Sequence, residues 1–217
     1  MKTNTELIVL HTTRTGDSSI VVHTLSKEYG RRSFLIRGLR KKPVMNLLLP
    51  LNIIEADITD IGKSQLFYAS SLTPKYSLNR IRNNIYKNTM TLFISEVIYR
   101  TIKEGTTEDG LYDWCVKNIL LLDAIETDFS NFHIRFLLEF AVILGFSPED
   151  NNLRPFLGEH YPVVERFMKE SFADVMMIPL SGALRNEIAD EILRYIEFHS
   201  DSSINIASLK VLRELFS

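Results

Sequence analysis

The hydrophobic pattern of this 217-residue chain changes its period at Pro74. Before that proline, short runs of β-branched and aromatic residues alternate with turn residues, which is typical of strands joined by tight turns. After it, apolar residues recur at spacings of three and four, which is typical of amphipathic helices. The pattern therefore predicts a β domain over residues 1–76, followed by a helical domain over residues 77–217.

Five short strands are predicted in the first domain. Five strands in fewer than eighty residues fit the OB-fold, a small five-stranded barrel. Between the third and fourth strands, Pro43 and Pro50 bracket a segment whose Leu47, Leu48 and Leu49 are expected to be buried. The fold class predicted is a multidomain α+β protein with an N-terminal OB barrel and an all-helical remainder. The predicted strands cover residues 6–14, 20–25, 31–37, 52–58 and 65–72.

Five or six helices are predicted after Pro74. The first ends near Glu104, and the third ends at Gly145, a residue that suits a helix C-terminus. Residues 146–160 are expected to form a loop. Pro162 suits the first position of a short helix, and Ser181 is a candidate N-cap for a longer one.

The most basic window of the chain is Gly30 to Lys42, GRRSFLIRGLRKK, in which six of thirteen residues are Lys or Arg and none is acidic. A strand has a side-chain period of two, so Phe34 and Ile36 are expected to face the core while Arg31 and Arg37 lie on the outer face. This much positive charge suits a polyanion, and a solvated strand edge that resists aggregation is the alternative. The candidate nucleic-acid-binding residues are Arg14, Arg31, Arg32, Arg37, Arg40, Lys41 and Lys42.

Charge is unevenly distributed along the chain. Residues 1–78 contain eleven Lys and Arg against six Asp and Glu, whereas the remainder contains fourteen against twenty-one. The formal net charge of −2 hides this asymmetry. A basic first third on an acidic remainder indicates one part that meets a polyanion and another with a different role. Tyr29, Phe67 and Tyr68 are candidate rings for stacking on bases, although the sequence does not show which of them are exposed.

Few residues point to catalysis or to a cofactor. The chain has no phosphate-binding glycine loop and no H-E-x-x-H motif, and its five histidines lack the spacing of metal ligands. The single Cys115 falls on the apolar stripe of a helix, where a core role is expected. Glu55, Asp57 and Asp60 form the one compact acidic set, for which a solvated face is the expected role. We therefore expect no enzyme activity, no cofactor and no metal.

Residues 6–42 resemble the RecO family of bacterial recombination mediators. The resemblance rests on ELIVLHTTRTGDSS, IVVHTLSKEYG and RRSFLIRGLRKK, and it continues more loosely through NLLLPLNIIEADI, NFHIRFLLEFAVILGFSP and SLKVLRELF. It implies an OB-fold followed by helices, and binding of single- and double-stranded DNA with annealing of complementary strands. It further implies RecR, single-stranded DNA-binding protein, RecF and RecA as partners in DNA repair, with DNA contacts on the basic residues of the barrel.

Two features depart from the family pattern. Many members carry a four-cysteine zinc module where this chain reads PEDNNLRPFLGEHYP, so no zinc is expected. The acidic helical domain suits protein docking better than DNA. With no signal-peptide pattern and no long apolar run, a soluble cytoplasmic protein associated with the nucleoid, with no membrane partner, is expected.

Two other functions remain open from the residues. One is a protein-interaction adaptor with an OB-like barrel and no DNA binding of its own. The other is a metal-dependent nuclease, which would need clustered acids such as Glu55, Asp57 and Asp60 to hold the metal.

Overall fold

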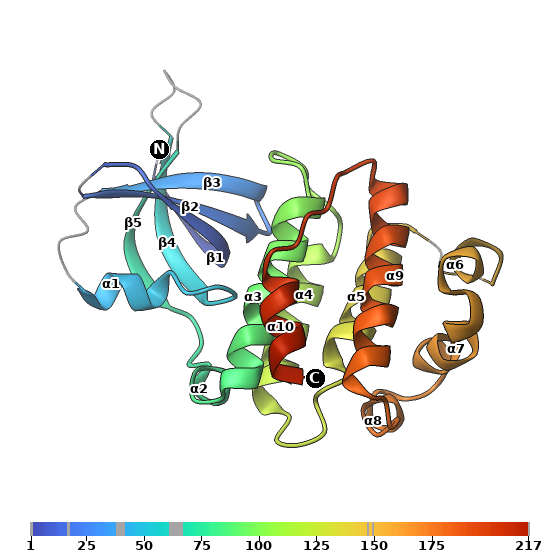
Figure 1. Ribbon diagram of the computed structural model, residues 1–217. Helices are drawn as coiled ribbons and strands as arrows, with labels where there is room; N and C mark the ends of the chain where they lie inside the picture. The colour runs from blue at the N-terminus through green and yellow to red at the C-terminus, as the bar shows by residue number, and fades with distance from the viewer. Residues whose placement is uncertain are drawn as a thin grey trace.

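The computed structural model describes residues 2–16, 18–37, 42–60, 67–146, 148 and 150–216, with the backbone alone at residues 42, 43, 150 and 151. Its first part is a closed barrel in which the strands follow the order β1-β2-β3-β5-β4 (Figure 1). The β3–β5 pairing is parallel, and the other pairings are antiparallel. The predicted OB-type barrel is confirmed. The strands are β1 (Lys2–Arg14), β2 (Ser19–Ser26), β3 (Gly30–Arg37), β4 (Ile53–Asp60) and β5 (Phe67–Pro74).

Alternating side chains fill the inside of the barrel, as the period of two predicts. Phe34 and Ile36 of β3 are buried there together with Val22 of β2 and Ile54 of β4. The pairing of β1 with β2 shifts register between Val9 and His11. Ordinary alternation along β1 points Leu7 and Val9 into the barrel, while Ile8 and Leu10 pack outside it among the helices.

A short helix, α1 (Lys42–Leu47), lies between β3 and β4. It occupies the segment in which three leucines were expected to be buried. Leu48 is buried and Leu47 is partly buried, but Leu49 is 40% exposed, so the expectation is wrong for that residue. Only Leu47 lies in α1, whereas Leu48 and Leu49 lie in the turn that follows the helix.

The remainder of the chain is helical. Asn84 caps α3 by accepting hydrogen bonds from the backbone N–H groups of Tyr86 and Lys87, and Ser181 caps α9, as predicted, by accepting one from Leu184. The helices are α2 (Asn79–Arg82), α3 (Ile85–Thr101), α4 (Leu111–Ala124), α5 (Phe132–Ile143), α6 (Asp150–Leu157), α7 (Tyr161–Lys169), α8 (Phe172–Met176), α9 (Gly182–Ser200) and α10 (Ser208–Phe216), with a 3-10 turn at Gly158–His160.

The expected loop at residues 146–160 is wrong, because α6 and the 3-10 turn occupy most of it. Leu153 and Leu157, four residues apart, are buried, and Phe156 packs its ring edge against Tyr195 of α9. Pro155 inside the helix and Pro148 before it hide this short amphipathic pattern in the sequence. No helix in the described part of the chain is long and apolar enough to cross a membrane.

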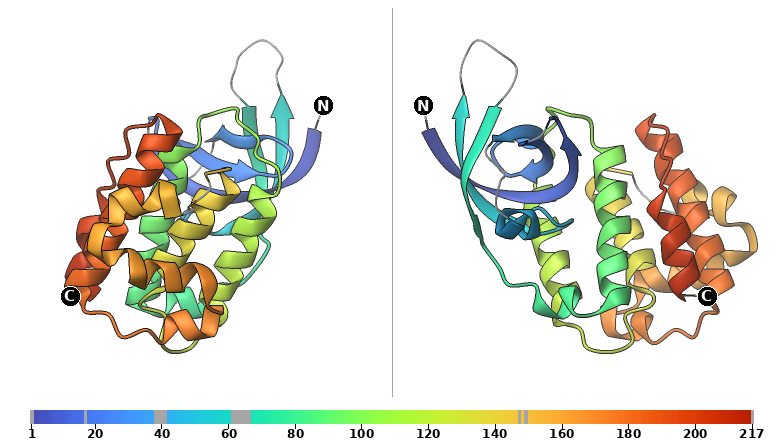
Figure 2. Two further views of the ribbon diagram at one scale, coloured as in Figure 1. Left: turned by 90° about the vertical axis from the view of Figure 1, so that its right-hand side faces the viewer. Right: turned by 60° about the vertical axis from the view of Figure 1, so that its left-hand side comes forward.

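The barrel and the helices share one apolar cluster. Ile8 and Leu10 of β1, Leu25 of β2 and Ile53 of β4 belong to the same buried cluster as the helices. Figures 1 and 2 show α3 running beside the barrel, with α10 packed on α3. The outer surface of the barrel is thus divided: one side is buried against α3, and the other is available to solvent.

A backbone clamp holds the β2–β3 hairpin to the loop after α3. The N–H of Arg31 donates to the carbonyl oxygen of Thr106 at 3.1 Å, and the N–H of Gly105 donates to the carbonyl oxygen of Arg31 at 2.8 Å. Gly30 has a φ of +58°, and a Cβ atom there would overlap the carbonyl of Thr106. Only glycine fits both the conformation and the close approach.

We expect Gly30→Ala to lower the free energy of unfolding by about 2–4 kcal/mol, because it adds left-handed strain and a clash with backbone. Urea unfolding monitored by circular dichroism measures this loss. Gly16→Ala is the matched control, since Gly16 also has a positive φ of +86° but a Cβ there meets no atom within 4 Å. Equal losses in the two variants would show that the clamp contributes nothing.

Candidate nucleic-acid interface

The exposed Arg37 and the half-buried Tyr68 form a cation–aromatic pair on the side of the barrel away from α3. The guanidinium carbon of Arg37 lies 4.7 Å from the centre of the Tyr68 ring, and its Nη2 donates to the Tyr68 hydroxyl at 2.8 Å. The register of β3 and β5 creates the pair, since Leu35 lies directly opposite Tyr68. A ring held beside a cation is the arrangement with which single-strand-binding barrels contact a base and its phosphate.

Arg14 lies at the same end of the barrel. It pairs in register with Ile20, and the neighbouring Ser19 pairs with Arg37. Both arginines are exposed, and neither has an acidic partner among the described residues. Their charges are therefore available to a ligand.

Arg32 is half-buried on the inner side of β3. Its guanidinium carbon lies 4.3 Å from the centre of the Phe67 ring. Phe67 in turn packs with Tyr29 and Phe34, with ring centres 5.8 and 6.2 Å away. Arg32 has no ion pair with any described residue, so it adds positive charge to this end of β5, but Tyr29 is part of the packing rather than an isolated stacking ring.

The expectation that Arg31 faces solvent is wrong. Arg31 is on the outer side of β3, as predicted, but α3 and the following loop cover it, and it is only 7% exposed. Its Nη1 pairs with Glu104 at 3.0 Å, and its guanidinium lies 4.6 Å from the ring centre of Tyr99. Burial works to raise the pKa of Glu104, but hydrogen bonding to Ser33 and the charge of Arg31 outweigh it and lower that pKa. Arg31 therefore contributes to the clamp rather than to a free surface.

The side chains of the other three candidates lie outside the described part of the structure. Arg40 and Lys41 lie outside the described residues, and Lys42 opens α1 with its side chain outside them.

Other cations of the first third are paired with acids. Lys2 pairs with Asp57 at 2.8 Å, and Lys27 pairs with Asp113 at 2.8 Å. Lys75 pairs with both Glu6 and Glu55, at 2.9 and 2.8 Å. Among the described side chains, the excess positive charge is thus concentrated at Arg14, Arg32 and Arg37, which we call the arginine strip.

The acidic set does not form a metal site in the described part of the chain. Glu55 and Asp57 are both engaged by lysines, and the hydrogen bonds of Lys2, Ser71 and Asn4 lower the pKa of Asp57 to about 2. No cluster of three or more His, Cys, Asp or Glu residues with metal-binding geometry occurs in the ranges that the structure describes. Cys115 is fully buried, and burial raises the pKa of its thiol far above the ordinary value.

The helical part carries an apolar pocket that the sequence did not reveal. Its volume is about 350 Å³, and it lies between α4, α5 and α7. Its polar groups come from Arg135 and Glu139 of α5. The apolar lining is provided by Trp114, Leu138, Val142, Ile143, Pro148, Phe167 and Met168.

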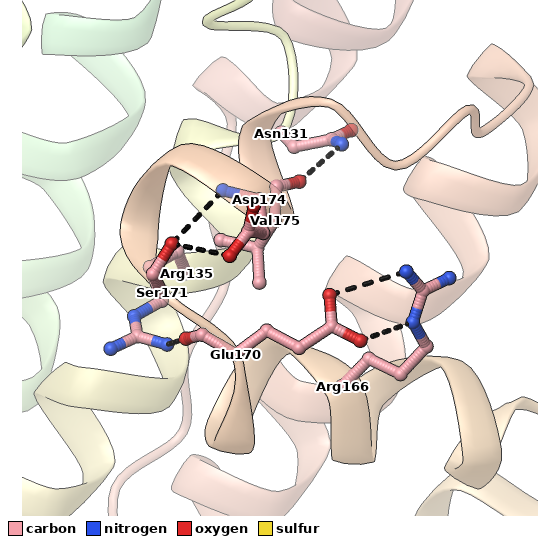
Figure 3. Close-up of polar contacts among 7 residues, drawn as sticks. All are labelled: Asn131, Arg135, Arg166, Glu170, Ser171, Asp174 and Val175. Atoms are coloured by element: carbon pink, nitrogen blue, oxygen red, sulfur yellow. Dashed lines mark hydrogen bonds and ion pairs between the residues drawn. The ribbon is translucent and has the colours of Figure 1, made fainter.

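Arg135 is anchored at one side of this pocket. Its Nε donates to Glu139 at 2.6 Å, and its Nη1 donates to the carbonyl oxygen of Phe167. The same Nη1 donates to the carbonyl oxygen of Glu170 (Figure 3). The Glu170 side chain instead forms a two-point pair with Arg166, at 2.6 and 3.2 Å. The Nη2 of Arg135 has no acceptor among the described residues, so part of this fixed guanidinium can still bind a carboxylate.

These features define a class of protein: a closed OB-type barrel with an open arginine strip, joined to a helical part with a pocket. The profile of the family described as Recombination protein O N terminal matches residues 1–77, and that of Recombination protein O C terminal matches residues 82–152. The chain belongs to the RecO family.

Curated relatives agree with this assignment. The chain is 28% identical to the DNA repair protein RecO of Phocaeicola vulgatus, over 97% of both chains. It is 22% identical to that of Azobacteroides pseudotrichonymphae over 98% of both, and 26% identical to that of Porphyromonas gingivalis over 96% of this chain and 97% of the relative. The family and its relatives are named for DNA repair and recombination.

Arg31 and Arg37 allow the two roles of arginine to be separated. We expect Arg31→Met to lower the free energy of unfolding by about 1–3 kcal/mol, since it removes the charged partner of Glu104. We expect Arg37→Met to change it by less than about 0.5 kcal/mol, as is usual for an exposed substitution. Urea unfolding of both variants measures the difference, and a stable Arg31→Met variant would contradict the structural role.

Proposed function

We propose that this protein binds and anneals single-stranded DNA in repair and recombination, and helps RecR to load RecA. The observation that carries the proposal is the arginine strip: Arg14 and Arg37 are exposed, Arg37 lies beside Tyr68, and none of the three arginines is ion-paired with a described residue. Family membership adds the DNA repair context. Double-stranded DNA is a second ligand, because phosphate contacts carry no sequence information.

Electrostatics supports annealing without catalysis. Two complementary strands repel each other through their phosphates, and bound cations lower this repulsion while releasing counterions. The strip supplies such cations on one side of the barrel. We therefore propose that the protein works by binding and breaks no covalent bond, with no cofactor, and that it acts at the nucleoid in the cytoplasm.

The pocket of the helical part favours a protein ligand. Its apolar wall beside the Nη2 of Arg135 suits a peptide that ends in an apolar residue and carries carboxylates. We assign it to the acidic, apolar-ended tail of single-stranded DNA-binding protein. Protein docking at the pocket would accompany DNA binding here, whereas the adaptor alternative has no DNA binding of its own. RecR, and RecF with it, are proposed as further partners without an assigned surface.

The salt dependence of DNA binding tests the strip. We expect Arg14→Gln and Arg37→Gln each to weaken binding of a fluorescent oligonucleotide and to reduce the log–log salt slope by about 0.7, the contribution of one single-strand phosphate. Fluorescence anisotropy between low and moderate salt measures the slope.

Arg194→Gln is the control for this experiment. Arg194 is exposed on α9, far along the chain from the barrel. Its replacement removes the same charge and is expected to leave the slope unchanged. A wild-type protein that does not bind bare DNA would favour the adaptor alone, and unchanged slopes in both barrel variants would refute the strip.

The substitution Val142→Asp tests whether the pocket binds the acidic tail. Val142 is 57% exposed at the pocket, so an added carboxylate there should repel an acidic tail without disturbing the core. We expect binding of the tail peptide of the cognate single-stranded DNA-binding protein to weaken at least about tenfold, which corresponds to about 1.4 kcal/mol. Val211→Asp on α10, where Val211 is 44% exposed, is the matched control. Equal peptide affinity in both variants would place the tail elsewhere.

A further inference from the structure

A second cleft lies where the barrel meets α3 and the start of α10. Its volume is about 290 Å³, close to the lower end of the roughly 300–1,000 Å³ range of small-ligand sites. The walls are mainly apolar, and two rings and one guanidinium are among the lining groups. The lining includes Leu10, His11, Pro50, Leu92, Tyr99 and Arg100.

The rings at this cleft are held in place. His11 and His23 stack with ring centres 5.7 Å apart and planes inclined by 19°, and Tyr99 lies 5.2 and 5.1 Å from them. His23 is fixed by hydrogen bonds to Ser33 at 2.8 Å and Thr13 at 3.1 Å. Burial, together with the charge of Arg31, lowers the pKa of His23, so its imidazole is neutral at neutral pH. The outermost ring, His11, is exposed.

Arg100 supplies a cation at the rim. Its only ion pair among the described residues is with Glu96, at the long distance of 3.8 Å, and its side chain is 48% exposed. Glu96 is occupied elsewhere: it accepts from the N–H of Ala207 at 3.2 Å and from the N–H and hydroxyl of Ser208 at 2.8 and 2.6 Å. Burial works to raise the pKa of Glu96, but these bonds outweigh it and lower the pKa.

The cleft and Arg37 lie along the same neighbouring strands, β1, β2 and β3. Arg37 pairs with Ser19, and four residues further along β2, His23 pairs with both Ser33 and His11. Four residues of a strand span about 13 Å. A single strand that contacts Arg37 and Tyr68 can therefore reach His11 within a few nucleotides.

We propose that this cleft binds one unstacked nucleobase of the single strand that the arginine strip holds. The base stacks on His11 and Tyr99 against the apolar wall, and Arg100 contacts the adjoining phosphate. This site rests on the proposed function, because it extends the same DNA path. Fixed rings beside a cation fit a base better than an ion, and the short distance along β2 from Arg37 to the cleft favours a nucleotide over a peptide.

Photo-crosslinking tests which groups touch the base. The full-length protein is bound to oligonucleotides that carry 5-iodo-deoxyuridine at successive positions, irradiated, digested and sequenced by mass spectrometry. We expect crosslinks at His11 or Tyr99 in addition to those at Tyr68. Crosslinks at Tyr68 with none at the cleft would overturn the proposal. They would favour an apolar side chain of a partner protein as the ligand of the cleft.

Affinity measurements separate this site from the strip. We expect His11→Ala and Arg100→Gln each to weaken oligonucleotide binding by at least about fivefold, the lower end of the effect of losing one stacked base. Arg194→Gln, which removes the same charge on α9, is the control. Both cleft residues are exposed, so folding should be retained, and circular dichroism verifies this.

The outcomes are distinct for the two proposals. If Arg37→Gln weakens binding while His11→Ala and Arg100→Gln match the wild type, the nucleobase site is refuted and the strip stands. If the wild type does not bind the oligonucleotide, both are refuted.

Discussion

Burial of one side of the barrel against α3 is the constraint on which the other features depend. This barrel closes its strands into a ring and so leaves no open sheet edge. Its outer surface is still divided between the part that packs against the helices and the part that can bind a ligand. Here one part of the outer surface packs against the helices through Ile8, Leu10 and Leu25. The backbone clamp at Gly30 holds the β2–β3 hairpin to the loop after α3 at the edge of this packed surface. Ligands of the barrel are therefore confined to its uncovered surface, which includes Arg37 and Tyr68 and borders the cleft beside α3.

Local patterns in the sequence were sufficient for most of the fold. Strand alternation placed Phe34 and Ile36 in the barrel, and the change of period at Pro74 separated strands from helices. The failures have a common cause. Arg31 is covered by a residue 73 positions away, and α6 depends on packing against α9, so no local pattern signals either contact. Tertiary contacts override local preference at such positions.

The charge count predicted the candidate site less well than the hydrophobic pattern predicted the fold. Eleven Lys and Arg in residues 1–78 predicted a dense cationic surface. Ion pairs between neighbouring strands, such as Lys2 with Asp57 and Lys75 with Glu55, neutralise part of it. The sequence named Tyr68 as a candidate ring, but its exposure depends on the register of β5 against β3, which only the fold supplies. The pocket at Trp114 combines three helices and could not be found from the spacing of residues within any one of them.

The shared apolar cluster also sets how DNA and protein ligands can act together. Because barrel and helices bury side chains in one cluster, the arginine strip and the pocket between α4, α5 and α7 keep a fixed separation. Figure 1 shows α7 on the far side of the helical part from the barrel. The remainder of the chain carries seven more acidic than basic residues, which disfavours the spread of DNA onto it. Under the proposed function, a protein tail in the pocket would therefore not have to leave before DNA binds to the arginine strip, and a strand released by that partner would meet the barrel at high local concentration.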